Sequence, residues 1–114
     1  MNETLYNELL RLARNKKIAS YSEVSPLVGL SMDIEEHRDQ MANLLGEIVH
    51  HEHGNNRPML TSLVVHKGND NNPGEGFFSI ATELGYFDGS RDKIARLTFW
   101  ANQVTNVHNH WSKA

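Results

Sequence analysis

The chain has 114 residues, of which 39% are apolar and 22% charged, and its formal net charge is −3. This length and composition are typical of one globular domain around a single core, residues 1–114, whereas the small negative charge is unlike that of most nucleic-acid-binding proteins. The absence of cysteine excludes disulfides, thiolate nucleophiles and cysteine-ligated metal centres, and without a signal-like N-terminus or a long apolar run we expect a cytoplasmic protein outside the membrane.

The first quarter of the chain is predicted to be mainly helical. Apolar residues recur every three or four positions through residues 3–17, which indicates an amphipathic helix. Residues 18–21 are β-tending, so they form either a small strand or an extended segment. Ser22 is expected to cap a second, short helix that ends at Gly29.

The middle of the chain is predicted to hold a long helix and then a strand. Ser31 or Asp33 is expected to cap a helix over residues 34–53, whose apolar positions follow a helical stripe. Residues 60–66 are rich in aliphatic and β-branched side chains, and they predict a strand that is buried on at least one face.

The last third is predicted to contain a loop and two helices. Residues 66–76 are rich in Gly, Asn, Asp and Pro, which predicts an exposed loop. A helix closed by a glycine is expected over residues 77–84, and a final helix over residues 90–111. The final helix carries apolar residues such as Ile94 and Leu97 at helical spacing, so it is expected to cover the core along its length.

This order of elements predicts an α+β, mainly helical, winged-helix-like single domain with a small β-sheet, in which the loop is the wing. The runs KKIASYSEVSPLVGLS, MANLLGEIV and RPMLTSLVVHKG are similar in outline to the winged-helix domain of DNA alkyltransferases and alkyltransferase-like proteins. In that family a Pro-Cys-His-Arg stretch holds the alkyl-accepting cysteine. The matching place here has Pro58, Met59, Leu60 and Thr61, so alkyl transfer to a thiolate is excluded.

A second resemblance spans nearly the whole chain. The runs SYSEVSPLVGL, LLGEIVHHEHGNNRPMLTSLVVHKG and PGEGFF, with the terminal FW…W pattern, resemble a widespread uncharacterised family of short bacterial proteins. The resemblance implies one compact bacterial domain. It carries over no catalytic residue.

Two groups of side chains bear on catalysis and metal binding. His50 and His53 of the HHEH run lie about one helical turn apart, without HExxH or comparable spacing, so they form either a metal site or a solvated cluster that favours a helix C-terminus. Ser62, Thr61 or Ser79 with His66 nearby could form a nucleophile pair, but nothing resembles GxSxG. We therefore predict no enzymatic activity, no cofactor and no bound metal.

The run PGEGFF is the most distinctive local sequence. Gly74 and Gly76 could form a nest of amides for an anion at a helix start, but Glu75 would occupy the place of that anion. No phosphate-binding spacing accompanies the glycines. A structural role is therefore preferred, in which the glycines permit a tight return and Phe77 and Phe78 anchor the loop to the core.

Negative charge is concentrated in the long predicted helix. From Asp33 to His53 there are six acids and a single base, Arg38, for a net charge of −5 with histidine neutral. Such a helix is unsuited to a groove lined with phosphates but suited to a basic protein. The leading hypothesis is a non-enzymatic protein-binding module, such as an immunity protein or antitoxin that inhibits a basic nuclease or nucleic-acid enzyme. The predicted partner-binding residues are Glu35, Glu36, Asp39, Asn43 and Glu47.

The alternative hypothesis is a winged-helix DNA-binding or regulatory protein. The predicted nucleic-acid contacts are Arg11, Arg14, Lys16, Lys17 and Lys67. The sequence leaves open whether these residues form one patch, which partner is bound and what the oligomeric state is.

Overall fold

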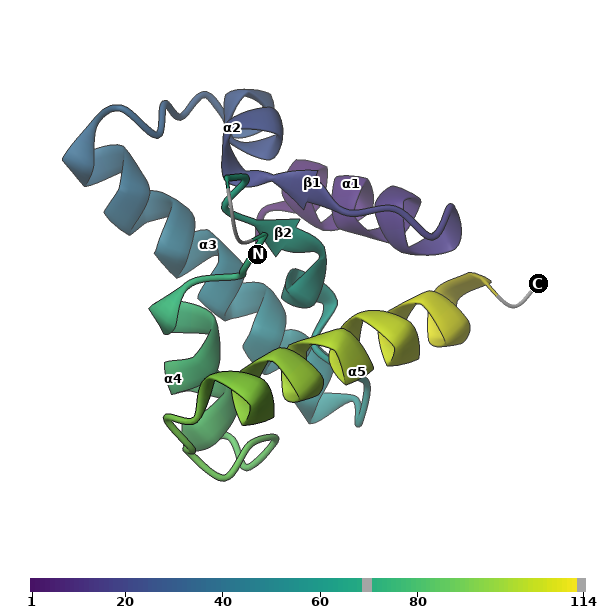
Figure 1. Cartoon of the computed structure of the whole chain (residues 1–114). Helices are drawn as coiled ribbons and strands as arrows, with labels where there is room; N and C mark the ends of the chain where they lie inside the picture. The colour runs from purple at the N-terminus through teal and green to yellow at the C-terminus, as the bar shows by residue number, and fades with distance from the viewer. Residues whose placement is uncertain (69–70, 113–114) are drawn as a thin grey trace.

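The computed structural model describes residues 1–68 and 71–112, so part of the predicted loop, residues 69 and 70, lies outside the described residues (Figure 1). In chain order the elements are α1 (Glu3–Arg14), β1 (Ala19–Ser20), α2 (Tyr21–Val24), the 3-10 helix η1 (Ser25–Val28), α3 (Glu35–Gly54), the 3-10 helix η2 (Leu60–Leu63), β2 (Val64–Val65), α4 (Glu75–Glu83) and α5 (Lys93–Ser112). The two strands pair in parallel. The predicted α+β, mainly helical class with a small sheet is confirmed. Among the helices of residues 1–68 and 71–112, none has the length and apolar character needed to cross a bilayer.

Helix α1 packs its apolar stripe against η2 and α5. The buried side chains of the stripe are Leu5, Leu9, Leu10, Leu12 and Ala13. The helix ends at Arg14, three residues before the predicted end, because Lys16 adopts a left-handed conformation with φ 54°. The backbone N–H of Lys16 donates to the carbonyl of Ala13 (3.2 Å) and that of Lys17 to the carbonyl of Leu12 (2.8 Å), which is a Schellman motif. Lys16 occupies the position after the helix where glycine is usual, so the sequence did not indicate that α1 ends at Arg14.

The cap of α2 is Ser20, so the predicted cap at Ser22 was wrong. The Ser20 hydroxyl oxygen accepts a hydrogen bond from the backbone N–H of Glu23 (3.1 Å), and the Glu23 carboxylate accepts one from the backbone N–H of Ser20 (3.0 Å). This reciprocal capping box satisfies two backbone donors that a helix start otherwise leaves unpaired. As predicted, Gly29 ends the following turn in a left-handed conformation, with φ 74°.

Helix α3 begins without a side-chain cap. Its N-cap residue is Ile34, so the prediction of Ser31 or Asp33 in that role was wrong. Ser31 instead donates its backbone N–H to Nδ1 of His37 (2.9 Å), so a side chain from the first turn of the helix holds the preceding segment in place. The inward side of α3 consists of Met41, Leu45, Ile48, Val49 and Glu52.

Residues 60–66 form a strand only in part. Leu60–Leu63 is the 3-10 helix η2 and only Val64–Val65 is β2, so most of the predicted strand was wrong. Every side chain from position 60 to 65 is buried, because η2 lies among α1, α3 and α5. A continuous apolar run of this kind cannot be told from a buried helical turn by its periodicity.

Helices α4 and α5 enclose a second, aromatic cluster. Helix α4 begins at Glu75, two residues before the predicted start, and Gly85 follows its end with φ 85°. Helix α5 begins at Lys93 because the Asp92 carboxylate accepts a hydrogen bond from the backbone N–H of Ala95 (2.9 Å). The residues of the cluster are Val49, Met59, Phe77, Phe78 and Ala81, with Phe87, Phe99 and Trp100 packed against them.

The prediction that α5 covers the core along its length was wrong for its N-terminal half. Ile94 is 72% exposed and Leu97 is 56% exposed, whereas Val107 in the C-terminal half is buried. Figure 1 shows α5 crossing the molecule from the end of α4 toward α1. Only the later turns of α5 therefore lie against the main core.

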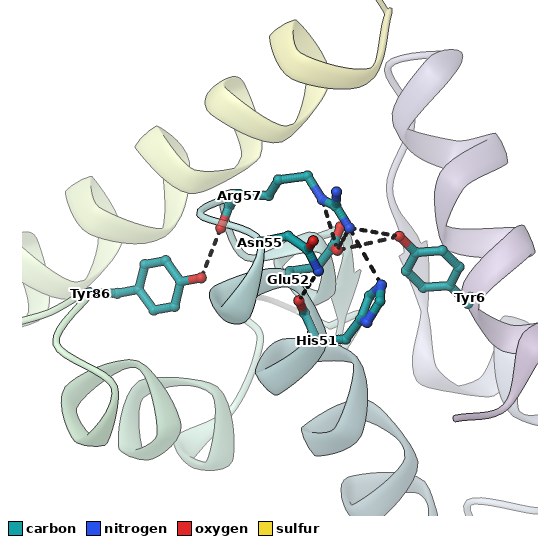
Figure 2. A network of polar contacts seen from close by, with 6 residues as sticks. All are labelled: Tyr6, His51, Glu52, Asn55, Arg57 and Tyr86. Carbon is teal, nitrogen blue, oxygen red and sulfur yellow. Dashed lines mark hydrogen bonds and ion pairs between the residues drawn. The ribbon is translucent and has the colours of Figure 1, made fainter.

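A buried carboxylate joins four separate parts of the chain (Figure 2). The side chain of Glu52 on α3 is 0% exposed, and its Oε2 accepts hydrogen bonds from Nη2 (2.6 Å) and Nε (3.0 Å) of Arg57 and from the hydroxyl of Tyr6 on α1 (3.3 Å). The guanidinium carbon of Arg57 lies 5.3 Å from the ring centre of Trp111 on α5. The hydroxyl of Tyr86, just after α4, donates to the carbonyl of Arg57 (2.8 Å).

The Glu52–Arg57 ion pair also sets the protonation of its neighbours. Burial and the negative charge of Glu52 raise the pKa of Tyr6, and the hydrogen bond from Arg57 to Glu52 raises the pKa of Arg57. Tyr6 therefore stays neutral and Arg57 stays charged at neutral pH. Nε2 of His51 lies 3.4 Å from Nη2 of Arg57, and Asn55 donates to the His51 carbonyl (2.8 Å), which completes the network in Figure 2.

We predict that Arg57→Ala lowers the free energy of unfolding by about 3–5 kcal/mol, because it leaves the Glu52 carboxylate buried without its cation. Urea denaturation followed by circular dichroism measures the change. The matched control is Arg11→Ala, which removes an arginine from the exposed pair with Glu8 and is expected to leave the midpoint nearly unchanged. Equal midpoints for the two variants would contradict the prediction.

Candidate functional site

The predicted partner-binding residues lie together on the outer side of α3. Glu35, Glu36, Asp39, Asn43 and Glu47 are all exposed. At about 100° per residue they span an arc of about 120° on the helix surface. Within the described part of the chain, the first three acids make no ion pair, and Glu47 contacts the N-terminal ammonium of Met1 (3.3 Å). These five residues are called the acidic face below.

Glu52 does not belong to the acidic face, although the sequence-based charge of the helix included it. Its side chain is buried against Arg57 on the opposite side of α3. From Asp33 to Glu47, five acids and the single base Arg38 remain, so the exposed part of the segment has a net charge of −4. The sequence overestimated the exposed charge because it did not reveal the pairing with Arg57, five residues away.

The acidic face is also hollowed. An open surface depression of about 980 Å³ lies beside it, lined by Asn43, Glu47 and His50 together with small residues of α3, Ala42 and Gly46. Small side chains next to carboxylates leave room for a long basic side chain to reach the charge. The depression is therefore suited to receive the basic side chains of the partner that the acidic face predicts.

The histidine run at the end of α3 does not converge. His50 is exposed beside the acidic face, His51 lies against Arg57, and the ring of His53 packs edge-on against Tyr86 with 5.2 Å between ring centres. Within residues 1–68 and 71–112, no group of three or more His, Asp or Glu side chains is arranged to hold a metal ion.

The residues considered as nucleophiles do not form a pair with a histidine in the described part of the chain. Thr61 and Ser62 are buried in η2, and Ser79 is exposed on α4. His66 stacks on Tyr21, with 4.3 Å between ring centres, and makes no side-chain hydrogen bond to either serine in the described residues. No serine–histidine pair is therefore formed in this part of the chain.

The predicted nucleic-acid contacts do not form a single patch. Arg11 is paired with Glu8, and Lys67 with Glu23. Lys16 and Lys17 are exposed in the turn before β1. Because β1 and β2 are parallel and Ala19 lies opposite Val64, this turn and Lys67 lie at opposite ends of the strand pair. Arg14 is on α1, where its guanidinium lies 6.0 Å from the ring centre of Trp111.

A cavity of about 570 Å³ lies between α3 and α4, and the sequence did not predict it. Its apolar lining includes residues of α3, β2 and α4: Met41, Ala42, Leu45, Val49, Val65, Phe77 and Ile80. Its polar lining includes Arg38 of α3 and Lys67 after β2. Segments that are far apart in the sequence supply these residues, so no local pattern could have indicated the cavity. The one signal was the PGEGFF run, which lies at its wall.

Compared with protein-family models, curated proteins and solved structures, the chain matches none of them. The two resemblances noted from the sequence therefore remain resemblances.

The capping box beside the cavity predicts a specific pH dependence. Hydrogen bonds from Lys67 and from Ser20 lower the pKa of Glu23 to about 2, from an ordinary value of 4.5. Because the pKa is lower in the folded state, Glu23 stabilises the fold fully above about pH 4.5, and this contribution is lost as the pH falls toward 2.

We therefore expect Glu23→Gln to be less stable than the wild type at pH 7, with the difference shrinking between pH 4.5 and 2. Urea midpoints at several pH values measure the difference. Glu83→Gln removes an exposed glutamate of α4 outside the capping box, and it serves as the control. A Glu23→Gln difference that is constant from pH 7 to 2 would contradict the assignment.

Proposed function

We propose that the protein is a non-enzymatic protein-binding module whose acidic face docks a basic protein, as an immunity protein or antitoxin does when it inhibits a basic nuclease or nucleic-acid enzyme. The observation that carries the proposal is the arrangement of the acidic face on one exposed arc of α3. The proposal places the protein in the cytoplasm, where such an enzyme would have to be held inactive. The resemblance to short bacterial proteins is consistent with this role.

Electrostatics favours a basic partner. Carboxylates gathered on one side produce a negative potential that extends about one Debye length, ~8 Å at physiological salt. Such a potential speeds the encounter with a positively charged protein and disfavours an acidic one. The depression beside Asn43 and Glu47 gives the partner's cationic side chains a place to enter.

A purely structural explanation accounts for only part of the acidic face. Glu35 and Glu36 lie in the first turn of α3, where acids stabilise a helix through its dipole. Asp39 and Glu47 lie beyond that turn, so the dipole does not explain them. Because Glu47 also contacts the N-terminal ammonium of Met1, Asp39 discriminates most clearly between a structural role and partner binding.

The test begins with the partner. The untagged protein is recovered from its native host after nuclease treatment, and a stoichiometric basic protein is expected to accompany it. We predict that Asp39→Lys with Glu47→Lys weakens binding of this partner by at least about 100-fold and flattens its salt dependence, because two attractive contacts become repulsive.

The control for charge reversal is Glu83→Lys together with Asp88→Lys, which make the same change of net charge at exposed residues outside the acidic face. Isothermal titration calorimetry at two salt concentrations compares the variants. If both double variants bind alike, or if the partner is lost on nuclease treatment, the proposal is wrong.

One observation favours the alternative, a winged-helix DNA-binding or regulatory protein. An antiparallel bridge joins His66 to Asn72 at the position of the predicted wing, with 2.7 Å between the His66 nitrogen and the Asn72 oxygen. Lys67 lies within this segment. Under this alternative, Lys67 and the cations of α1 would contact DNA phosphates, while α3 would have to stay outside the groove because of its charge.

The alternative predicts that Lys67→Ala and Arg14→Ala each weaken duplex DNA binding and reduce the slope of log affinity against log salt by about one. Fluorescence anisotropy with a labelled duplex measures both quantities. The variant Lys93→Ala controls for loss of a cation at the start of α5. A wild-type affinity with no salt dependence would count against DNA binding.

A further inference from the structure

The cavity between α3 and α4 has the size and lining of a small-molecule site. Its volume of about 570 Å³ lies inside the range of ~300–1,000 Å³ that is usual for ligand pockets. Along α3 its lining extends from Arg38 to Val49, a rise of about 16 Å. The lining is apolar for most of this length, through Met41, Leu45 and Val49, so the cavity favours a molecule with an extended apolar body.

The cavity also has cationic groups at its lining. Arg38 donates one hydrogen bond, from Nη1 to the carbonyl of Met32 (2.9 Å), and its side chain is exposed, so the remaining guanidinium donors are available to a ligand. Lys67 is partly neutralised by Glu23. Together with His66, these are the basic side chains that line the cavity. Because Glu23 already pairs with Lys67, Arg38 is the main cation left for a ligand, so the lining matches a ligand with a single negative charge.

The start of α4 adds a positive dipole end to the same cavity. Gly74, Glu75 and Gly76 line it, and Gly74 gives α4 no side-chain cap. The sequence suggested that the Glu75 carboxylate would occupy the place of an anion here. The structure shows otherwise, because Glu75 is paired with Arg96 of α5 (2.6 Å) and is 72% exposed. The first-turn amides of α4 are therefore not capped by this carboxylate.

The backbone around this helix start leaves open space. A Cβ at Gly76 would have no atom within 4 Å, whereas one at Gly74 would lie 2.9 Å from Nε2 of His66. His66 is stacked on Tyr21, whose hydroxyl donates to the carbonyl of Pro73 (2.8 Å). These contacts hold the helix start in position, and the space beside Gly76 remains free.

The lining also contains a hydroxyl group. Thr61 lines the cavity and is only 5% exposed. A hydroxyl both donates and accepts hydrogen bonds, so a polar atom of a ligand can pair with it.

From these observations we infer that the cavity binds an amphipathic organic anion, a monocarboxylate whose apolar chain lies against α3 and α4 and whose carboxylate is held by Arg38 and the start of α4. A guanidinium matches the two oxygens of a carboxylate, and the hydrogen bond is strengthened by charge. The inference does not rest on the proposed function, although the cavity borders the depression beside the acidic face and shares Ala42, Gly46 and Ile80 with it.

The test uses octanoate as the probe, with octan-1-ol and octylamine as its neutral and cationic counterparts. Isothermal titration calorimetry is expected to show one-to-one binding of octanoate, at least about tenfold tighter than that of either counterpart. Arg38→Gln is expected to weaken octanoate binding about tenfold or more, and Arg38→Lys to weaken it less because the charge is kept. The control Lys16→Gln removes an exposed cation far from the cavity lining and is expected to leave binding unchanged.

A second variant tests the location without altering charge. Ser22 lines the cavity, is exposed and does not line the depression beside the acidic face, so Ser22→Phe fills part of this space alone, and it is expected to weaken octanoate binding at least about tenfold. Circular dichroism checks that each variant is folded. The inference is overturned if the wild type does not bind octanoate, if octan-1-ol binds equally well, if Arg38→Gln binds like Lys16→Gln, or if Ser22→Phe binds like the wild type.

Discussion

The ion pair between Glu52 and Arg57 is the interaction on which the arrangement of the helices depends. A fully buried carboxylate is costly unless a cation and hydrogen-bond donors compensate it. Arg57 and Tyr6 do so at Oε2 of Glu52, whereas Oε1 has no hydrogen-bond partner among the described residues. Because Arg57 also lies over Trp111 and its carbonyl accepts from Tyr86, the compensation requires α1, α3 and α5 to be in place together. The pair thus links the packing of the two apolar clusters.

The same geometry sets the orientation of the two surfaces on which the proposals rest. With Glu52 fixed inward, the rotation of α3 is set, and its acids beyond the first turn point outward while Arg38 and Leu45 border the cavity. One helix therefore contributes a charged outer side, an apolar inner side and part of a cavity wall. The division follows from the helical repeat once a single residue is anchored.

Much of this fold could be predicted from the sequence, and the misses have identifiable physical causes. The periodic helices α1 and α3 were predicted to within a few residues, because an amphipathic stripe is a strong signal. The segment at residues 60–66 failed because burial on all sides removes the alternation that marks a strand. Ser20 was missed as a cap, although Glu23 lies three residues after it as a capping box requires. Glu52 was counted as a surface acid because its pairing with Arg57 depends on a reversal of the chain after α3. The acidic face could be predicted because its residues belong to one helix. The cavity could not be predicted, because it combines segments that are distant in the sequence.

The packing of α1 against α5 has a consequence for the order in which the chain folds. Helix α1 is synthesised first, but η2 and α5, against which its leucines are buried, are synthesised much later, and α5 last of all. The pairing of Ala19 with Val64 is also far apart in the sequence. Contacts of such long sequence separation form slowly, because loop closure costs entropy before the contact repays it. The emerging chain therefore carries the apolar stripe of α1 unprotected until α5 has left the ribosome, and during that interval the stripe is exposed to aggregation and to chaperones.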